Sequence, residues 1–475
     1  MKHIKYTLAA AILCVSGSAK AQNLNSAYFM DGFTYGHELN PAQEYDRDSY
    51  FSVPFLPGNL NVGLKGNLQL KDIFLQNPNG NGLATYLHPD ISYDKAMSGF
   101  SSNNKLLTDL RWDLLSFGFH AFKGYNTVTV GIRTNVGMNI PYELFSLTKK
   151  LENRDYNFSN LGVDATAWAE VALGHSHQVN EAWRVGGKAK ILIGGAYARM
   201  KMDNLDMNLQ DANRWTLATK ANMEVGVKGF TWGEPERKEY KSRPGEYYEQ
   251  IDFDNMDVES PGIGGMGFAL DLGAEWDLGK QDLLDGMKVS ASILDLGFIK
   301  WKNVATASNN GDDFIFEGFN NIQVEDGPGT SMDDQIDELG DKLEDLYRLQ
   351  DGGSTSKARM LGATLNLAVE YALPMYKKLK FGFLSSTRIQ GVYSWNEERI
   401  GATVSPCKWF EASANLGVGT VGTSMGWVIN LHPRGFSLFL GMDHLLGKLS
   451  KQFIPLNSHA NISMGINYPL GKSRK

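Results

Sequence analysis

The sequence alternates apolar and polar residues over stretches of ten residues or more, many times along the chain. In "TVTVGIRTNVGM" (127–138), Val128, Val130 and Ile132 share one face, and Arg133 lies on the other. A period of two is typical of a β-strand with a single apolar face. An average strand has roughly 5 to 6 residues, whereas a tilted strand needs roughly 9 to 11 to cross a bilayer. The alternation therefore predicts membrane-spanning strands.

Alternating segments of this kind predict fourteen strands, at 59–70, 111–122, 127–139, 163–177, 183–201, 264–278, 287–301, 358–373, 380–393, 399–405, 409–419, 423–431, 436–446 and 459–470. Short connections mostly alternate with much longer ones. An even strand number with short turns on one side and long loops on the other is typical of outer-membrane barrels. We therefore expect an all-β, transmembrane antiparallel β-barrel over residues 58–470, with both termini in the periplasm and a short periplasmic tail at 471–475.

The first residues resemble a secretory signal peptide. Lys2 and Lys5 give a basic start, Tyr6 to Val15 form an apolar core, and Ala19-Lys20-Ala21 is a small-x-small cleavage site. We expect cleavage after residue 21, and hence export to the outer membrane. Beyond the signal peptide no run of 18 apolar residues occurs, so the sequence predicts no transmembrane helix.

Charge and cysteine content exclude several classes of function. Loss of residues 1–21 removes three of the 46 basic residues and none of the 53 acidic ones. The acidic chain that remains argues against a nucleic-acid partner. Cys407 is then the single cysteine, which excludes an intrachain disulfide and a cysteine-based zinc site. We expect no cofactor and no bound metal.

Some segments depart from the simple pattern. The apolar face switches at Ile293-Leu294, which a β-bulge would explain. Residues 204–227 also alternate, and we place them in a hairpin inside the outer excursion 202–263. In the outer loop 302–357, apolar residues recur at helical spacing, which predicts a short acidic helix. This helix either covers the barrel mouth or acts as a moving gate or a partner-docking helix. Aromatic girdles are expected at both bilayer interfaces, with Trp112, Trp301, Trp395 and Tyr197 near the outer strand ends.

Motifs associated with catalysis and metal binding lack their usual context. "GIGGMG" (262–267) matches a dinucleotide fingerprint and "GTSMG" (422–426) a nucleophile elbow, but each is followed by a strand where a helix is needed. His175 and His177 share one strand face and could bind one metal, although no cysteine or nearby carboxylate on that face completes a ligand set. The alternative is a pair of interfacial histidines near a turn, and we expect no enzyme.

Charged residues on the inner strand faces form the substantive candidate site. By strand parity they face away from the apolar side, and therefore into the lumen of a barrel: Arg133, Glu170, Lys188, Lys190, Asp271, Glu275, Asp277, Glu370, Arg388 and Glu411. A lipid-facing Arg or Lys would cost roughly 2–4 kcal/mol at the bilayer midplane. The spacing leaves two alternatives open. These groups either brace the barrel through salt bridges or line a path for a ligand.

Two stretches carry a family resemblance. Residues 28–66 contain "NPA" at Asn40-Pro41-Ala42 followed by "YFSVPFLPGNLNVG", and "GFALDLGAEWDLG" precedes "KVSASILDLGFIKW". Essentially the whole mature chain resembles an outer-membrane family of Gram-negative bacteria without assigned function. More distantly it is similar to FadL-type transporters of hydrophobic compounds, which are fourteen-stranded barrels. The resemblance implies an N-terminal plug, here residues 22–57 with the Asn40-Pro41-Ala42 motif. It supplies no substrate.

The sequence thus favours a monomeric outer-membrane barrel, surrounded by membrane lipid, that binds or passes a small hydrophobic or amphipathic molecule. One alternative is a non-transporting scaffold, such as a barrel that shuttles cargo during secretion. A second alternative, a barrel enzyme, would require Ser, His and an acidic residue to converge at one rim. An apolar pocket beneath the outer loops, with a gap in the wall or plug, would favour transport over both.

Overall fold

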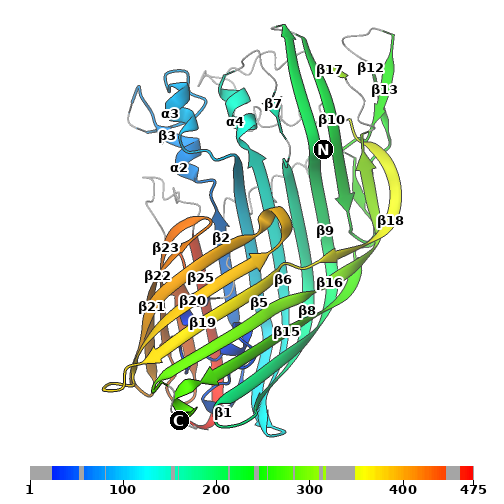
Figure 1. Cartoon of the computed structure of the whole chain (residues 1–475). Helices are drawn as coiled ribbons and strands as arrows, with labels where there is room; N and C mark the ends of the chain where they lie inside the picture. Colours follow the sequence, from blue (N-terminus) through cyan, green and yellow to red (C-terminus); the bar gives the residue numbers. More distant parts are fainter. Residues whose placement is uncertain are drawn as a thin grey trace.

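Strand pairing runs around the molecule and closes on itself (Figure 1). This computed structural model describes residues 24–52, 58–80, 82–150, 156–158, 160–211, 214–239, 245–253, 255–281, 284–309, 314–316, 348–445 and 460–473. Within these ranges, fourteen wall positions form a closed antiparallel barrel. The predicted transmembrane β-barrel is confirmed, whereas the expected signal peptide and the expected acidic helix of loop 302–357 lie outside the described residues.

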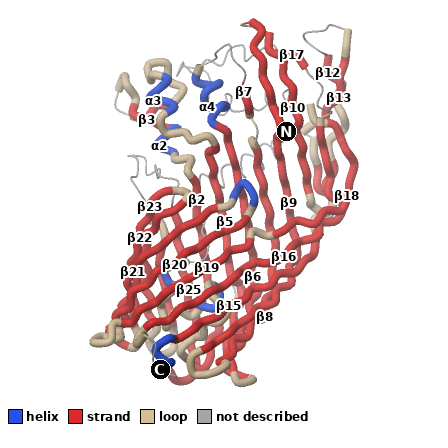
Figure 2. Tube along the Cα trace, in the orientation of Figure 1, coloured by secondary structure: helices blue, strands red, loops and turns tan. Residues whose placement is uncertain are grey.

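The wall strands follow one another in chain order. They are β1 (Arg47–Phe51) with β2 (Asn59–Gly66), β5 (Asn103–Ala121), β6 (Gly124–Pro141), β8 (Gly162–Gln178), β9 (Trp183–Asp211), β15 (Gly265–Asp277), β16 (Met287–Ser308), β18 (Gln350–Met360) with β19 (Ala363–Ala372), β20 (Leu379–Ile389), β21 (Trp395–Cys407), β22 (Phe410–Gly419), β23 (Gly422–Leu431), β24 (Ser437–Met442) and β25 (Ala460–Ser473). Strands dominate the trace in Figure 2.

The seam of the barrel is made by the two ends of the chain. β25 pairs with β1 near its C-terminal end and with β2 near its start, and both β1 and β2 pair with β5 on their other side. β1 and β2 therefore share one wall position. Arg47–Phe51 thus lies in the wall, although it falls inside the range 22–57 that the sequence predicted as plug.

The parity switch in β16 is a β-bulge, as predicted. Leu270 pairs with Leu296 and Leu272 with Ile293, so two residues of β16 stand opposite Asp271. One of the two, Asp295, has a φ of 57°, and its N–H donates to the Asp271 carboxylate at 2.7 Å. The extra residue returns Leu296 to the outer face of the wall.

The predicted strand 358–373 is two strands. β16 pairs with β19 up to Leu294↔Thr364 and then, past the bulge, with β18 from Phe298↔Met360. Residues 361–362 step from one strand to the other. This step turns Leu361 inward, where it packs against the buried cluster around Trp301. Uninterrupted alternation along one strand 358–373 would place Leu361 on the apolar outer face instead.

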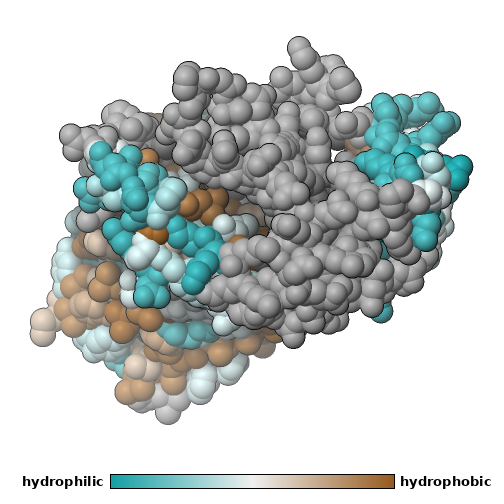
Figure 3. Space-filling model, turned by 90° about the horizontal axis from the view of Figure 1, so that it is seen from above, coloured by the Kyte–Doolittle hydropathy of each residue, from teal (hydrophilic) through white to brown (hydrophobic). Residues whose placement is uncertain are grey.

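Above the barrel, the upper part of β9 continues into a hairpin with β10 (Arg214–Val225), which confirms the expected hairpin within 202–263. Further short elements lie outside the wall strands: α2 (Leu70–Ile73), β3 (Phe74–Gln76), β4 (Leu83–Thr85), α3 (Tyr93–Met97), α4 (Tyr142–Lys149), β7 (Tyr156–Asn157), β11 (Phe230–Thr231), β12 (Glu236–Glu239), β13 (Tyr247–Gln250), β14 (Asp257–Val258), β17 (Phe314–Phe316) and η3 (Leu278–Gln281). Seen from above, the region around α2 and α3 and the β12–β13 hairpin are hydrophilic (Figure 3). None of the helices in the described ranges is long and apolar enough to span a membrane.

Large apolar side chains lie on the outside of the wall. Exposed examples include Leu173, Ile191, Phe268, Ile400 and Leu416. Near the lower rim, Trp183 and Trp276 stack with ring centroids 5.1 Å apart. Three aromatic residues predicted for the outer girdle instead lie buried inside: Trp301, Trp395 and Tyr197. For Trp301 the cause is the β16 bulge. For Tyr197 it is a register shift between β8 and β9 at Ala167/Trp168.

Candidate functional site

An N-terminal segment, residues 24–45, fills the lower half of the barrel. It contains two short 3-10 helices, η1 (Asn25–Ala27) and η2 (Gly36–Glu38). Its apolar side chains are almost fully buried: Leu24, Tyr28, Met30, Phe33, Tyr35, Leu39 and Tyr45. They form one cluster with residues of the surrounding wall such as Leu384, Val428 and Phe439. This aromatic-rich stretch has no period-2 pattern, so it packs as an irregular core rather than as a strand.

The Asn40-Pro41-Ala42 motif lies against two glycines. Gly186 of β9 and Gly273 of β15 are paired neighbours in the wall. A Cβ atom on Gly186 would come within 2.0 Å of the Pro41 carbonyl oxygen, and one on Gly273 within 2.0 Å of Asn40 Oδ1. Any side chain at either position would collide with the motif, so both positions require glycine. The motif therefore fits a flat patch of wall that has no side chains.

Glu38 of the N-terminal segment is the centre of a buried ionic cluster. Its carboxylate contacts the Arg111 guanidinium, Lys188 Nζ at 2.7 Å and His37 Nδ1 at 3.3 Å. Burial would raise the pKa of Glu38, but Arg111 and Lys188 outweigh it and hold this pKa well below its ordinary value. The segment is thus bound to β5 and β9 by charge as well as by apolar packing.

Further inner-face charges are paired within the wall. Arg133 donates to both Asp113 and Glu170 at 2.6 Å. On neighbouring strands, Lys190 lies 2.7 Å from Asp271 and 2.6 Å from Asp295 in the β16 bulge. Apart from Asp295, which is partly exposed, these groups are buried. The middle of the lumen on this side is therefore filled by compensated ion pairs.

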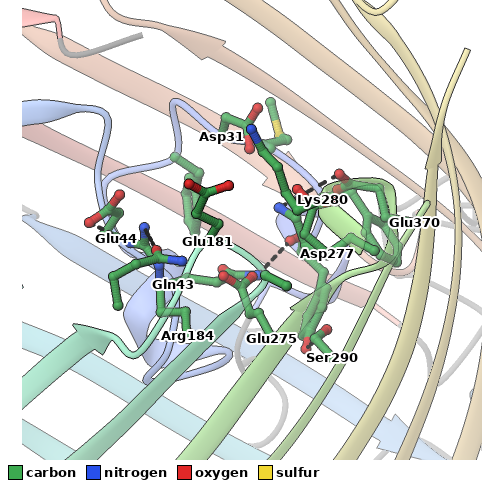
Figure 4. Close-up of a pocket in the computed structure, with 18 residues that line it drawn as sticks. Asp31, Gln43, Glu44, Glu181, Arg184, Glu275, Asp277, Lys280, Ser290 and Glu370 are labelled. Carbon is green, nitrogen blue, oxygen red and sulfur yellow. Dashed lines mark hydrogen bonds and ion pairs between the residues drawn. The ribbon is translucent and has the colours of Figure 1, made fainter. Parts of the chain in front are cut away.

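A lower pocket of about 310 Å³ lies between the N-terminal segment and the lower ends of β9, β15 and β16 (Figure 4). Carboxylates of Glu275, Asp277 and Glu370 and the guanidinium of Arg184 line it. Lys380 joins its wall to the segment, because its Nζ lies 2.9 Å from Asp31 and 3.2 Å from Glu370. The lower pocket is thus polar and mixed in charge.

Two further contacts fix the segment to the opposite wall. The Glu411 carboxylate accepts from the N–H of Gly32 at 2.9 Å. The Asp443 carboxylate accepts from the backbone N–H groups of Asn25 and Ser26 at 2.9 and 2.6 Å. The segment is therefore held by charged side chains on several sides of the barrel.

The serine of "GTSMG" belongs to a structural network. Ser424 Oγ lies 3.1 Å from Glu397, and it accepts from Arg399 at 3.3 Å. Glu397 is also bound by Lys65 at 3.2 Å and lies 3.9 Å from His444. Ser, His and an acid do come together here, but the serine hydroxyl lies beside a carboxylate that two cations already neutralise. This arrangement holds the wall and does not activate a nucleophile.

His175 and His177 stack on the outer face near a turn, with ring centroids 5.9 Å apart. His175 Nδ1 lies 3.0 Å from Asn126 Oδ1. In the ranges that the structure describes, no group of three or more His, Cys, Asp or Glu side chains is placed to hold a metal ion.

A second, larger cavity lies in the upper half. This upper cavity has a volume of about 780 Å³ and is lined by β8, β9, β16, β18 and the β20–β21 hairpin. The hairpin tip, η4 (Gly391–Tyr393), reaches across the lumen, where Tyr393 donates to the Gly162 carbonyl at 3.3 Å. Next to the tip, Gln390 donates to Asn135 at 2.5 Å. The upper cavity is thus bounded by wall strands and by this tip.

The upper cavity reaches through the wall. Inner-face residues such as Trp168, Trp301 and Arg388 line it, but so do Met360 and Ile389, which are 71% and 61% exposed on the outer surface. β19 pairs with β20 only up to Ala363↔Ile389, and the pairing that β18 shows within the described ranges is with β16. The wall therefore has a gap beside residues 361–362, where β18 replaces β19.

The ten sequence-predicted inner-face residues fall into separate groups. Six are buried: Arg133, Glu170, Lys188, Lys190, Asp271 and Glu411. Glu275, Asp277 and Glu370 line the lower pocket, and Arg388 lines the upper cavity. Strand alternation could not predict Glu38 as an inner-face charge, because the N-terminal segment that contains it has no period-2 pattern. It also missed Arg199 and Arg359, whose faces are reversed by the register shift in β9 and by the step at 361–362.

Fold and lumen together define a transmembrane β-barrel whose lower lumen is occupied by its own N-terminal segment. Residues 41–443 match a family of unknown function, DUF5723, and the chain belongs to that family. This confirms the expected membership of a barrel family without assigned function. Among curated proteins, no sequence matches the chain.

Several solved barrels are similar at low identity. The toluene transporter TodX of P. putida is 9% identical, with 96% of this chain and 97% of that one covered and a TM-score of 0.40. The toluene transporter TbuX of Ralstonia pickettii is 8% identical, with 95% of each chain covered and a TM-score of 0.39. A FadL homologue of Pseudomonas aeruginosa is 10% identical over 95% of this chain and 100% of that one, with a TM-score of 0.40. These values agree with the expected distant similarity but are too low to carry an argument.

Proposed function

We propose that this outer-membrane barrel binds a small hydrophobic or amphipathic molecule in the upper cavity and exchanges it through the wall gap, while the N-terminal segment acts as a plug below. The observation that carries the proposal is the continuity of the upper cavity from the inner face to the exposed Met360 and Ile389. A volume of about 780 Å³ lies within the range of roughly 300–1,000 Å³ usual for small-molecule sites. We take the barrel to act as a monomer.

The filled lower lumen supports a lateral route for exchange. Below the upper cavity, the N-terminal segment and the ion pairs of Glu38, Arg133 and Lys190 occupy the interior. A straight path to the periplasm would require this segment to move. The wall gap, in contrast, is bordered by apolar side chains such as Leu296, Met360 and Ile389, which suit a molecule that dissolves in hydrocarbon.

A larger side chain in the upper cavity should weaken binding. We expect Leu361→Trp to weaken binding of dodecan-1-ol at least about tenfold, because the indole would take up space that the ligand occupies, and such steric conflicts cost about 1–3 kcal/mol. Leu365→Trp is the matched control, since Leu365 lies four residues further on and is exposed on the outer face. Native mass spectrometry at graded dodecan-1-ol concentrations would count the bound molecules. An unmodified protein that binds none would refute the proposal.

A further inference from the structure

Three neighbouring turns at the lower rim of the barrel form one continuous arc. They join β19 to β20, β21 to β22 and β23 to β24, strands that follow one another around the wall (Figure 1). The Ser405 N–H donates to the Lys378 carbonyl at 2.8 Å, and the His432 N–H donates to the Trp409 carbonyl at 2.8 Å. Backbone hydrogen bonds thus hold each turn beside the next. We call these turns together the rim arc, residues 374–378, 406–409 and 432–436.

The rim arc is basic. Its turns contain four Lys or Arg residues and no Asp or Glu. All four cationic side chains are exposed: Lys377, Lys378, Lys408 and Arg434. Lys377 lies 3.8 Å from Asp285 of the adjacent β15–β16 turn, but both side chains are exposed, so solvent screens this pair. Elsewhere on the rim, the β5–β6 turn contributes one cation, Lys123, and the β8–β9 turn contributes Glu181 and no cation. Positive charge is therefore concentrated on one side of the lower rim.

Large apolar side chains lie beside these cations. Four are exposed within the rim arc: Met375, Tyr376, Trp409 and Phe436. On β24, Phe436 begins an exposed alternation with Leu438 and Leu440, and on β20 Phe381 and Phe383 are exposed in the same way. The apolar outer face of the wall therefore runs down into the rim arc. Trp and Tyr are enriched where hydrocarbon gives way to lipid head groups, because their rings combine an apolar body with a polar edge.

A row of cations at this boundary is suited to phosphate groups that carry net negative charge. The long apolar stems of Lys and Arg can lie along the wall while their charges reach the head groups. A lipid would contact the aromatic residues from its ordinary position in the bilayer, whereas a soluble acidic partner would first have to displace lipid from them. These observations favour a lipid over a protein as the occupant.

We infer that the rim arc is a binding site for anionic phospholipids of the leaflet that surrounds the lower rim. Head groups would lie at Lys377, Lys408 and Arg434, and acyl chains along the outer faces of β20 to β24. This site is separate from the upper cavity, and it does not depend on the proposed function.

The test compares two lipids with identical acyl chains. Dioleoyl phosphatidylglycerol is anionic, and dioleoyl phosphatidylethanolamine has no net charge. Native mass spectrometry of the full-length protein at graded lipid concentrations should show phosphatidylglycerol binding about tenfold or more tightly, because each nearby Lys or Arg adds attraction to an anionic head group. Since the rim arc is exposed, this preference should weaken as the salt concentration rises.

Two matched variants locate the preference. The rim variant combines four substitutions, Lys377→Gln, Lys378→Gln, Lys408→Gln and Arg434→Gln. It should lose most of the preference and bind phosphatidylethanolamine as the unmodified protein does. The control variant makes the same change at four exposed lysines in the upper part of the molecule and should keep the preference: Lys71, Lys95, Lys220 and Lys302.

Several outcomes would overturn the inference. The first is equal binding of the two lipids by the unmodified protein. The second is a preference that survives in the rim variant, which would place the anionic lipid elsewhere, such as in the upper cavity. The third is an equal loss in both variants, which would trace the preference to net charge. Displacement of phosphatidylglycerol by a polyglutamate peptide would identify the rim arc as a docking surface for an acidic protein instead.

Discussion

Gly186→Val is expected to weaken the packing of the N-terminal segment against the barrel wall. A Cβ atom at this position would meet three backbone atoms of the Asn40-Pro41-Ala42 motif within 2.5 Å: the Pro41 carbonyl oxygen and carbon, and the Ala42 nitrogen. Neither the wall nor the proline-containing motif can shift aside easily. We expect a loss of about 3 kcal/mol for the seated segment, at the upper end of typical overpacking costs.

The measurement is amide hydrogen exchange over residues 24–45, which should accelerate about 100-fold when the segment loses about 3 kcal/mol of local stability. Gly187→Val is the control. Gly187 is the next residue of the same strand, and its Cβ would meet nothing closer than 3.8 Å. Both variants make the same substitution in β9, but on opposite faces. If hydrogen exchange over residues 24–45 accelerated equally in both variants, distortion of β9, rather than the clash with the Asn40-Pro41-Ala42 motif, would be the cause.

Glu38→Gln is expected to destabilise the barrel by about 3–5 kcal/mol, the usual cost of removing one partner from a buried ion pair. The amide would leave the buried Arg111 and Lys188 without their shared negative partner. Glu44→Gln, in the same segment, is the control. Glu44 pairs with Arg184 where both side chains are partly exposed, so its loss should cost at most about 1 kcal/mol. Urea unfolding followed by heat-modifiable gel migration measures both.

The pH dependence of this effect has a defined sign. The pKa of Glu38 is held well below its ordinary value of 4.5 by Arg111 and Lys188. Its contribution to stability is therefore fully present above about pH 4.5 and is lost as the pH falls toward the depressed pKa. The difference between the unmodified protein and Glu38→Gln should be constant near neutral pH and shrink in acid. A difference that grew in acid would contradict this account of the cluster.

The wall could be predicted from the sequence because lipid imposes a strict alternation on every spanning strand. The parity of "TVTVGIRTNVGM" gives β6 its correct faces along its whole length. The same reasoning located the β16 bulge, because a bulge inverts the alternation at a visible point. Trp301 was nevertheless placed on the wrong face, since the consequence of the bulge was not carried beyond it.

The candidate site was harder to predict because its parts come from exceptions to the pattern. Arg359 follows a strand break that alternation alone does not reveal, and Arg199 follows a register shift between β8 and β9. Glu38 lies in a segment with no periodicity, whose position depends on long-range contacts with Arg111 and Lys188. Local spacing contains no information about such partners. The glycines at 186 and 273 gave no signal either, since only the Asn40-Pro41-Ala42 motif opposite them explains their presence.

The shared seam of β1, β2 and β25 has a consequence for biogenesis. The N-terminal segment runs directly into β1, and β1 pairs with the last strand of the chain. The barrel is therefore closed by a strand, β1, that continues directly from the segment filling the lumen. During assembly β1 cannot form its pairing with β25 until that last strand is present, some 400 residues later in the sequence. Loading of the interior and sealing of the wall thus become a single late event of assembly.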